Sequence, residues 1–497
     1  MIVEEFNWVL SIAVFLPVVG AIITLSFLSG KAARSFAVII TLTELLITSY
    51  IFLAYRNGPG GYQMADRITG WIPIDSFKVD YYLAVDGISA PLVLLSGILG
   101  IVAVFASWNV THRMKEHFMW LLALQGAVIG VFTSLDFFLF FLFWELELIP
   151  MFFLISIWGS GRKEYSAMKF LIFTILGSAF MLLGILVLYF SLGTFDMTQM
   201  HEKLEHATLI LPASVLFFLT IIGFAVKLPV FPFHTWLPDA HTDAPTAASV
   251  MLAGVLLKMG GYGMLRVSAS IFPDQLIEFS WLLASLGVIN IIYGAAITIR
   301  QTDLKRLIAY SSISHMGFVL LGLASTNGSE VVLGMTGAAL QMFTHGTITA
   351  LLFLTVGYIY ERSHTRHIPD LGGLAGRMPF LATALLIAGL ASLGLPGTSG
   401  FVAEITVFLG IFPAWKLFAI IGASVVILTA GYILWMIQRS IFGPRPTHHD
   451  NLTDATLPEM IPIAILVVSI IGLGIYPEFV SNIFSEGILM LPPEIVN

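Results

Sequence analysis

Apolar segments of about 20 residues recur along almost the whole chain and are separated by short polar loops. About fourteen such segments are present, and each is long enough to cross the hydrocarbon core of a bilayer as an α-helix. Their approximate centres are residues 18, 44, 97, 125, 146, 181, 219, 255, 288, 313, 345, 393, 429 and 468. The pattern predicts an all-α integral membrane protein with about fourteen transmembrane helices, folded as a single polytopic membrane domain over residues 1–497.

Two regions near the N-terminus need separate interpretation. The first apolar segment, about Asn7 to Leu28, is too long for the core of a signal peptide and has no basic residues before it, so we expect a retained helix. The longest loop runs from Arg56 to Asp86. Its stretch DSFKVDYYLAVDG alternates apolar and polar residues, which predicts a small surface hairpin.

Two of the predicted spans, the seventh and the twelfth, are interrupted by prolines and glycines. The interruptions are KLPVFPFHTWLPDA at 227–240 and LGLPGTSGF at 393–401. Such breaks leave backbone groups that lipid cannot satisfy, so they are expected inside the protein or beside a wet cavity. Paired broken helices are typical of a transport site.

The two breaks are five helices apart, and an odd spacing places two successive five-helix units in inverted orientation. We therefore expect two inverted repeats made of helices 4–8 and 9–13. The predicted organisation is N-terminal helices 1–3 in 1–110, a first antiporter-like repeat in 117–268, a second in 277–442, and helix 14 in 459–478.

Composition excludes several classes of function. Of the 497 residues, 58% are hydrophobic and 11% are charged, which excludes a soluble domain. The net charge of −7 is spread over the loops without a basic block, so nothing indicates nucleic acid as a partner. The chain has no cysteine, which excludes disulfides, thiol catalysis and cysteine-ligated iron–sulfur clusters.

The basic residues of the loops predict the orientation in the membrane. Loops after odd-numbered helices contain 15 lysines and arginines, against 6 after even-numbered helices. Because basic loops resist translocation, Arg162 and Arg366 are expected on the cytoplasmic or stromal side and both termini on the periplasmic or lumenal side. The membrane is expected to be the cell inner (plasma) membrane or a thylakoid.

Charged residues inside the predicted spans are the strongest functional signal: Glu145, Glu147, Lys227, Lys258 and Glu404. An ionised side chain at the centre of a membrane helix costs about 2.5 to 3.5 kcal/mol. These groups therefore need partners, water or a function. A structural ion pair explains one acid and one lysine but not charges spread over four helices.

Glu145 is predicted to pair with Lys227, and Glu147 is predicted to have an accessory role between helices. The two acids point about 200° apart on a regular helix. A lysine in a low-dielectric site releases its proton readily, and a nearby carboxylate helps it to retain the proton. Movement of Glu145 towards or away from Lys227 would therefore work as a switch.

Four histidines add to these buried charged residues, and together they form a row of titratable groups inside the predicted spans. His315 and His345 lie in the middle of predicted helices ten and eleven, where they suit either a proton relay or a packed hydrogen-bonding role. His234 and His241 flank the first break, where an accessory or a loop role is equally open. The glycines of KMGGYG around Lys258 favour close helix packing over phosphate binding.

Four stretches together identify a family resemblance: KLPVFPFHTWLPDAHTDAPTAASVMLAGVLLKMGGYGMLR, LKRLIAYSSISHMGF, ELELIP and LPGTSGFVAE. The chain resembles the antiporter-like membrane subunits of respiratory complex I, of the type called NuoM or, in photosynthetic relatives, NdhD. The resemblance covers nearly the whole chain. It implies fourteen helices with two inverted repeats and a proton path through Glu145, Lys227, Lys258, His315, His345 and Glu404.

The resemblance also implies a division of labour between subunits. This chain is expected to translocate protons as one subunit of an NADH or ferredoxin:quinone oxidoreductase and to contain no redox centre, cofactor or metal. Flavin, iron–sulfur clusters and quinone are expected in partner subunits, with NuoL-, NuoN- and NuoK-like subunits and lipids as neighbours. A subunit of a multisubunit cation/proton (Mrp-type) antiporter or of a membrane-bound hydrogenase is the alternative.

Overall fold

A computed structural model describes residues 2–74, 77–444 and 452–496. Twelve helices in this part of the chain are long and apolar enough to cross a membrane. Two more spans are assembled from shorter apolar helices at the two predicted breaks. The twelve long helices and these two interrupted ones agree with the fourteen spans predicted from the sequence.

The first half of the chain contains the N-terminal helices and the spans around the first break. Its helices are α1 (Val9–Phe27), α2 (Gly30–Arg56), α3 (Ser89–Ala106), α4 (Met114–Thr133), α5 (Phe137–Leu146), α6 (Leu148–Trp158), α7 (Lys163–Leu192), α8 (Met197–His206), α9 (Ala213–Lys227), α10 (Trp236–Asp243), α11 (Thr246–Met251), η1 (Leu252–Leu256), α12 (Leu257–Gly263), η2 (Met264–Ala269) and α13 (Pro273–Glu278). The segments α11 to η2 form one continuous span in which η1 and η2 are π-helical turns on either side of Lys258.

The second half has the same kind of interrupted span and a more extended C-terminal region. Its helices are α14 (Ser280–Ile299), α15 (Leu304–Leu323), η3 (Ser325–Asn327), α16 (Val331–Ser363), η4 (Ile368–Asp370), η5 (Leu374–Gly376), α17 (Pro379–Ser392), α18 (Ser399–Ala414), α19 (Lys416–Ser424), α20 (Val426–Ser440), α21 (Leu457–Ile475), α22 (Glu478–Ile488) and α23 (Pro493–Val496). The predicted helix 14 corresponds to α21, and the two short helices after it were not predicted.

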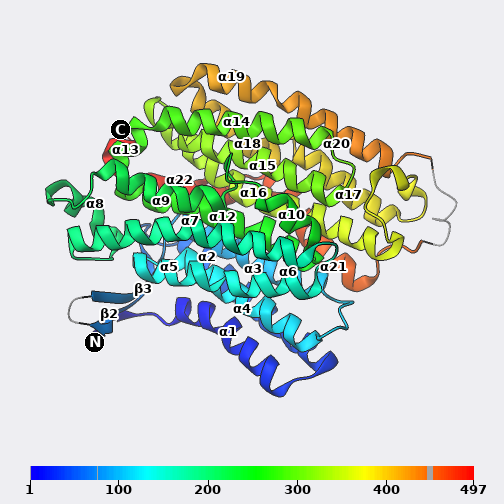
Figure 1. Cartoon of the computed structure of the whole chain (residues 1–497), viewed down its shortest axis with the longest axis horizontal. Helices are drawn as coiled ribbons and strands as arrows, with labels where there is room; N and C mark the ends of the chain where they lie inside the picture. Colours follow the sequence, from blue (N-terminus) through cyan, green and yellow to red (C-terminus); the bar gives the residue numbers. More distant parts are fainter. Residues whose placement is uncertain (1, 75–76, 445–451, 497) are drawn as a thin grey trace.

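A hairpin is present, but the stretch that predicted it starts at positions 75 and 76, outside the described residues, and continues as one mostly buried strand rather than as a surface hairpin. The hairpin is part of a three-stranded antiparallel sheet. Strand β2 (Gln63–Ile74) pairs with β3 (Phe77–Val85) and also with the N-terminal strand β1 (Ile2–Phe6), which the sequence pattern did not indicate. Buried Asp66 of β2 accepts hydrogen bonds from the backbone of Asn7, Trp8 and Ser11, and so joins the sheet to the start of α1. The sheet and the C-terminal end lie at the same end of the helix bundle (Figure 1), as an even number of spans requires.

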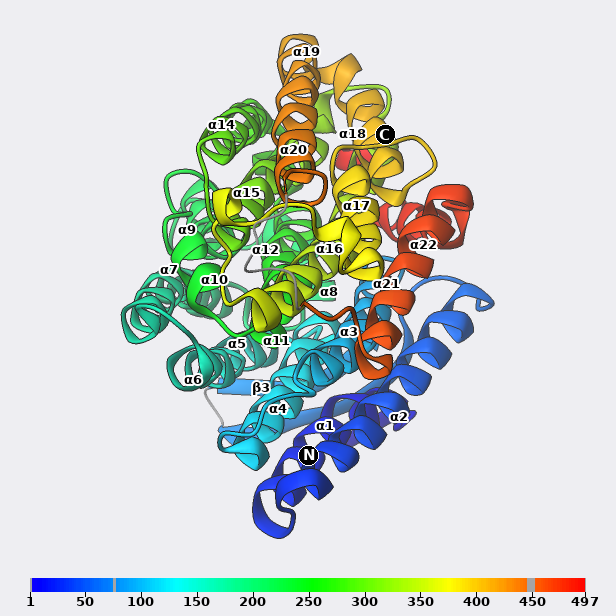
Figure 2. The same ribbon diagram turned by 90° about the vertical axis from the view of Figure 1, so that its right-hand side faces the viewer.

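Burial increases from the outside of the bundle to its centre. In Figure 2, α12 and α16 lie in the middle, α1 and α2 lie at one end, and α19 and α20 lie at the opposite end. The span 246–269 and α16 are buried along their length, whereas only about a third of α21 and of the α19–α20 span is buried. The outer helices expose Ile, Leu and Phe side chains, as expected of surfaces that face lipid.

The glycines of the KMGGYG stretch provide the close packing that the sequence predicted. A Cβ atom added to Gly260 would lie 2.6 Å from the carbonyl oxygen of Phe224 in α9. Added to Gly261, it would meet Met342 of α16. Small residues here bring the backbones of α9, α12 and α16 together, which places the two buried lysines on neighbouring helices.

Candidate functional site

The first acid–base pair lies directly beside the first helix break. Lys227 is the last residue of α9, and its ammonium forms an ion pair with the Glu147 carboxylate, at the point where α5 ends and α6 begins. The side chains are 1% and 0% exposed, so no solvent screens the pair. The rings of Trp144 and Phe170 lie 5.3 and 5.6 Å from the Lys227 ammonium and add cation–π contacts.

The prediction that Glu145 rather than Glu147 pairs with Lys227 is wrong. Glu145 is only partly buried and interacts electrostatically with Lys227, but the ion pair is made by Glu147. The prediction assumed one regular helix through both acids. The chain instead changes from α5 to α6 at Glu147, so the angle expected from 3.6 residues per turn does not apply at this position.

The backbone groups freed at the first break are hydrogen-bonded by a residue that the sequence analysis did not identify. Asn290, in the middle of α14, accepts a hydrogen bond from the Phe231 amide at 2.7 Å and donates one to the Pro229 carbonyl at 3.2 Å. The Trp236 indole donates to the Val226 carbonyl at 2.9 Å. A lone asparagine inside an apolar helix is the signal that could have identified Asn290, because it needs an interhelical partner.

Lys258 lies at the centre of the bundle and is fully buried. Its ammonium contacts the Ala253 carbonyl and lies 2.7 Å from His345 Nδ1 on α16. The carbonyl of Ala253 lies within the π-helical turn η1. Because Nδ1 and Nζ share one hydrogen bond, a proton on either group is within transfer distance of the other.

From His345 the series of contacts leads through His315 to the second acid, Glu404. The rings of His345 and His315 have centroids 5.7 Å apart, and His315 Nδ1 lies 3.2 Å from Glu404 Oε1 on α18. His315 Nε2 also lies 3.2 Å from the hydroxyl oxygen of Ser392, at the end of α17. The second break therefore contributes directly to the row, from both of its half-helices.

A small cavity of about 10 Å³ lies among His315, His345 and Glu404. This volume is near the lower limit for one water molecule. Gln341, Thr344 and Thr349 of α16 also line the cavity. A single water there has several polar partners, as an internal water requires.

The row extends in the other direction through a histidine between two lysines. His241 is fully buried, and neither ring nitrogen has a hydrogen-bond partner among the described residues. It interacts electrostatically with both Lys305 and Lys258. His234 has a different environment, because its Nε2 lies 3.1 Å from the hydroxyl of Tyr293.

Lys305 lies at a cavity of about 290 Å³ that has both polar and apolar lining residues. Its ammonium donates to the Ala244 carbonyl at 2.6 Å, and the side chain is 3% exposed. The cavity is lined by residues of the α3–α4 loop, the α10–α11 junction and the end of α16, and also by His117 of α4 and by Arg366, which follows α16. It thus lies at the end of the bundle opposite the β-sheet, since α3 begins next to the sheet and ends at the cavity.

The structure brings most of the predicted residues into two groups. One group is Lys227 with Glu147 and Glu145; the other is Lys258, His345, His315 and Glu404. Between the groups, α9 and α12 are in backbone contact at Gly260. A proton passing from Lys227 to Lys258 would need a water molecule between them.

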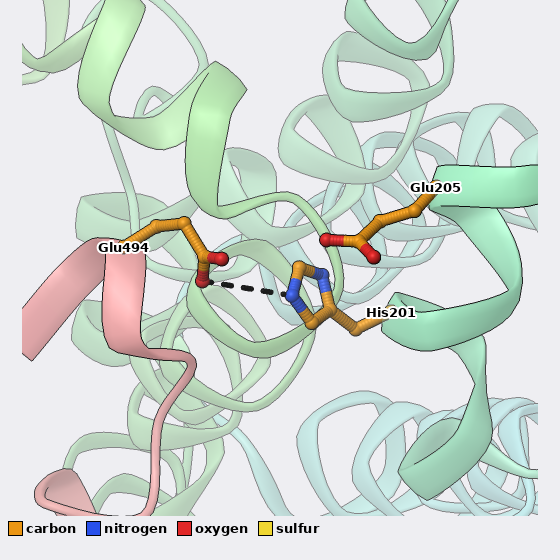
Figure 3. A group of neighbouring side chains, drawn as sticks. All are labelled: His201, Glu205 and Glu494. Carbon is orange, nitrogen blue, oxygen red and sulfur yellow. Dashed lines mark ion pairs between the residues drawn. The ribbon is translucent and has the colours of Figure 1, made fainter.

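Outside this row, His201, Glu205 and Glu494 form a group of three possible metal-ligating side chains (Figure 3). His201 Nε2 lies 3.6 Å from a Glu494 carboxylate oxygen, and Figure 3 shows the imidazole between the two acids. Both glutamates are exposed. We interpret the contact as an attachment of the C-terminal helix α23 to α8.

The fold and the site together define a polytopic membrane protein with an internal row of titratable groups and two interrupted helices. Residues 134–429 match the family model described as NADH:quinone oxidoreductase/Mrp antiporter, TM. The chain belongs to this family.

Proteins of similar sequence align with nearly the whole length of this chain. NAD(P)H-quinone oxidoreductase chain 4 1 of Synechococcus elongatus is 42% identical over 493 residues, covering 97% of this chain and 90% of the relative. Chain 4 of Acaryochloris marina is 41% identical, covering 97% and 91%. A chain of respiratory complex I from Thermus thermophilus with bound NADH is 28% identical with a TM-score of 0.86, covering 97% of this chain and 100% of that one.

A more distant solved structure shows the fold alone. A chain of the Mrp complex from Dietzia sp. has a TM-score of 0.84 at 19% identity, covering 99% of this chain and 98% of that one. The same arrangement of helices is thus present in both branches of the family description.

Proposed function

We propose that this chain is a proton-translocating membrane subunit of an NAD(P)H- or ferredoxin:quinone oxidoreductase, moving protons along its buried row while redox chemistry takes place in other subunits. The observation that carries the proposal is the contact series Lys258, His345, His315 and Glu404, in which each group is near the next inside the membrane. A purely structural core has no need for four titratable groups in succession.

Lys227 and its two acids form the element that controls the row. While Glu147 contacts Lys227, the ammonium is held in its charged form; when the carboxylate moves away, the buried lysine favours proton release. Glu145, within electrostatic reach of the same ammonium, is a second position from which a carboxylate can hold the proton. The proposed switch therefore involves both acids, and Glu147 is the resting partner.

Protons are proposed to reach the row from the cavity beside Lys305 by way of His241. Arg366 and Lys305 lie at this end of the bundle, which by the positive-inside rule supports placing it on the cytoplasmic or stromal side. The β-sheet and both chain ends then lie on the periplasmic or lumenal side. Single cysteines introduced into this cysteine-free chain and labelled with an impermeant reagent test this; labelling of position 367 from the periplasmic side would contradict it.

The relatives named as chain 4 of NAD(P)H-quinone oxidoreductase support a place for this chain in a multisubunit complex. We propose NuoL-, NuoN- and NuoK-like neighbours in a plasma or thylakoid membrane, with flavin, iron–sulfur clusters and quinone bound by partner subunits. Purification of the native complex tests the assignment. Co-purifying redox subunits support it, whereas a set of small antiporter subunits without redox centres would favour an Mrp-type complex.

The decisive experiment on function compares proton uptake with quinone reduction in vesicles. In Lys258→Ala, the complex is expected to assemble and proton uptake per electron to fall, because the centre of the row is removed. Thr347→Val, a fully buried substitution on α16 outside the contact series, is the matched control and should leave proton uptake unchanged. Normal proton uptake in Lys258→Ala would refute the proposal.

A further inference from the structure

The N-terminal helices contain a buried acid that the row does not use. Glu44 lies in the middle of α2, is 0% exposed, and neither of its carboxyl oxygens has a hydrogen-bond partner among the described residues. It occupies a buried stripe with Thr41 and Thr48 at helical spacing. A buried carboxyl without a partner requires an explanation.

Three helices pack against this part of α2: α1, α3 and α4. Ile40 contacts the position of Gly20 in α1, and Thr48 contacts that of Gly97 in α3. Glu44 lies between these two contacts, where the small residues let the helices approach closely. The carboxyl is therefore enclosed on all sides by protein, although α2 faces outwards with Leu42 and Leu46.

No basic side chain among the described residues lies close enough to Glu44 to neutralise it. The sequences of α1 and α3 contain no titratable side chain, and those of α4 (Lys115, Glu116 and His117) are all in its first turn. On α2 itself the basic residues lie at the two ends, Lys31 and Arg34 at one and Arg56 at the other. No charged side chain among the described residues interacts with Glu44 electrostatically.

A second unsatisfied group lies at the same level of the bundle. Arg34 of α2 donates to the Trp108 carbonyl just after α3, and Thr48 meets Gly97, so the antiparallel register of α2 and α3 places Glu44 near Gly100. The position of Gly100 in turn contacts the amide of Gln125 from α4. The Gln125 Oε1 atom is buried and has no hydrogen-bond donor among the described residues.

In the orientation in which Gln125 Nε2 donates to the Ser96 carbonyl and leaves Oε1 free, these two groups are complementary only when Glu44 carries a proton. An ionised carboxylate accepts hydrogen bonds but cannot donate to the Gln125 carbonyl oxygen, whereas a carboxylic acid donates one. The neutral acid also avoids an unpaired charge in a low-dielectric enclosure. We propose that Glu44 and Gln125 form a second proton-binding site, separate from the row and held in the neutral acid form by closure of α1, α3 and α4 around α2.

Closure and proton binding are one event in this site, because ionisation would require water between α2 and its three neighbours. The chemistry also predicts a selective covalent target. An apolar carbodiimide takes the acid proton on one nitrogen while the carboxylate oxygen bonds to its central carbon; an acyl shift then gives a stable N-acylurea with no leaving group. Only a protonated carboxyl that an apolar reagent can reach follows this route.

The test treats native membranes containing the assembled complex with N,N′-dicyclohexylcarbodiimide at neutral pH and maps the adducts by peptide mass spectrometry. Glu44 should be labelled from the lipid side when α2 transiently separates from its neighbours, and a water-soluble carbodiimide should not label it. Glu116, ion-paired with Arg113 in the first turn of α4, is the matched carboxyl expected to show the opposite preference. Protection of Glu44 by Na⁺ but not by K⁺ would make it a cation ligand and overturn the proposal.

Infrared difference spectra of wild type and Glu44→Gln provide a measurement that does not depend on reagent access. The wild type should contain one additional carboxylic acid C=O band at neutral pH, and Gln125→Leu should shift that band because its hydrogen-bond acceptor is removed. A carboxylate band in its place, or a band that Gln125→Leu leaves unchanged, would overturn the Glu44–Gln125 site. Both variants should retain quinone reduction, since neither residue belongs to the row.

Discussion

The two halves of the chain treat a buried acid and base in different ways. In the first half, Lys227 and Glu147 are in direct contact, fully buried and flanked by aromatic rings. In the second half, His315 and Glu404 lie 3.2 Å apart at the edge of a small polar cavity, and His315 has an additional partner in Ser392. The first arrangement is suited to storing charge and the second to passing a proton, because a small cavity with room for a water molecule lies beside the second pair.

The helix breaks beside these two pairs also differ from each other in how their backbone is held. At the first break, Asn290 satisfies the backbone with direct hydrogen bonds. At the second, Gly394 and Gly397 have φ values of 78° and 91°, in the left-handed region, and Glu404 Oε2 lies 3.0 Å from the position of a Gly394 Cβ. A side chain at Gly394 would be strained and would also crowd the acid. The two interrupted helices therefore provide different environments for their acid–base pairs within one architecture.

The largest expected effect comes from removing one partner of the first pair. Glu147→Leu leaves an uncompensated ammonium in the bundle and is expected to destabilise the protein by about 3–5 kcal/mol. Thermal unfolding of the purified membrane arm measures this. The double variant Glu147→Leu with Lys227→Met removes both charges and should recover most of the loss; an equally unstable double variant would mean that the pair is not what stabilises this region.

The next effect concerns Lys258, which joins the two halves. Lys258→Arg keeps a positive charge, but a guanidinium does not release its proton at working pH. Proton uptake should fall about 100-fold or more, the contribution expected of an acid–base group, while the assembled complex can still be isolated. Full proton uptake in this variant would indicate a structural ion pair in place of a relay.

Neutralisation of the second acid should affect function more than stability. Glu404→Gln keeps the shape and hydrogen bonding at His315, so we expect a stability change of about 1 kcal/mol or less. Proton uptake should nevertheless fall strongly, because an amide cannot exchange the proton. If Glu404→Gln destabilised the protein as much as Glu147→Leu, the two pairs would be equivalent and the contrast between the halves would be wrong.

The two acids near Lys227 give a finer test within the first half. Glu147→Gln should reduce proton uptake more than Glu145→Gln, since Glu147 makes the ion pair and Glu145 acts at longer range. The difference in thermal stability should have the same order. A larger effect of Glu145→Gln would show that the working state uses the alternative partner predicted from the sequence.

The smallest effect is expected at Asp136, in the loop before α5. Its carboxylate caps α5 by accepting from the Phe138 and Leu139 amides, yet burial raises its pKa to about 7. A raised pKa means that the folded protein binds the proton more tightly than the unfolded chain. Stability from the neutral form is thus complete below about pH 4 and is lost as pH rises through about 7. Asp136→Asn, which caps without titrating, should flatten thermal stability across this range; an unchanged pH profile would contradict the assignment.

Sequence reasoning located the residues of the site better than it assigned their partners. The spans, both breaks, the hairpin and every titratable group in the row were visible as polar or helix-breaking residues in an apolar background. The pairing of Lys227 was wrong because two acids two residues apart lie at a junction between helices. Lys305 was not among the predicted site residues, yet its ammonium is buried against the Ala244 carbonyl. The roles of Asn290 and Ser392 depend on contacts between helices distant in sequence.

The sequence alone predicts that the chain lies in a membrane, at which residues its helices are interrupted, and which buried charged side chains need a partner or a function. These properties follow from hydropathy, proline and glycine, which act locally and at high cost in lipid. The contact of Lys258 with His345, the ion pair of Glu147 with Lys227 and the lack of a basic neighbour of Glu44 in the described part of the chain are visible only in the tertiary structure. Those outcomes depend on which faces of distant helices meet, and the glycines at Gly260 and Gly261 set that packing through close approach rather than through any pattern along the chain.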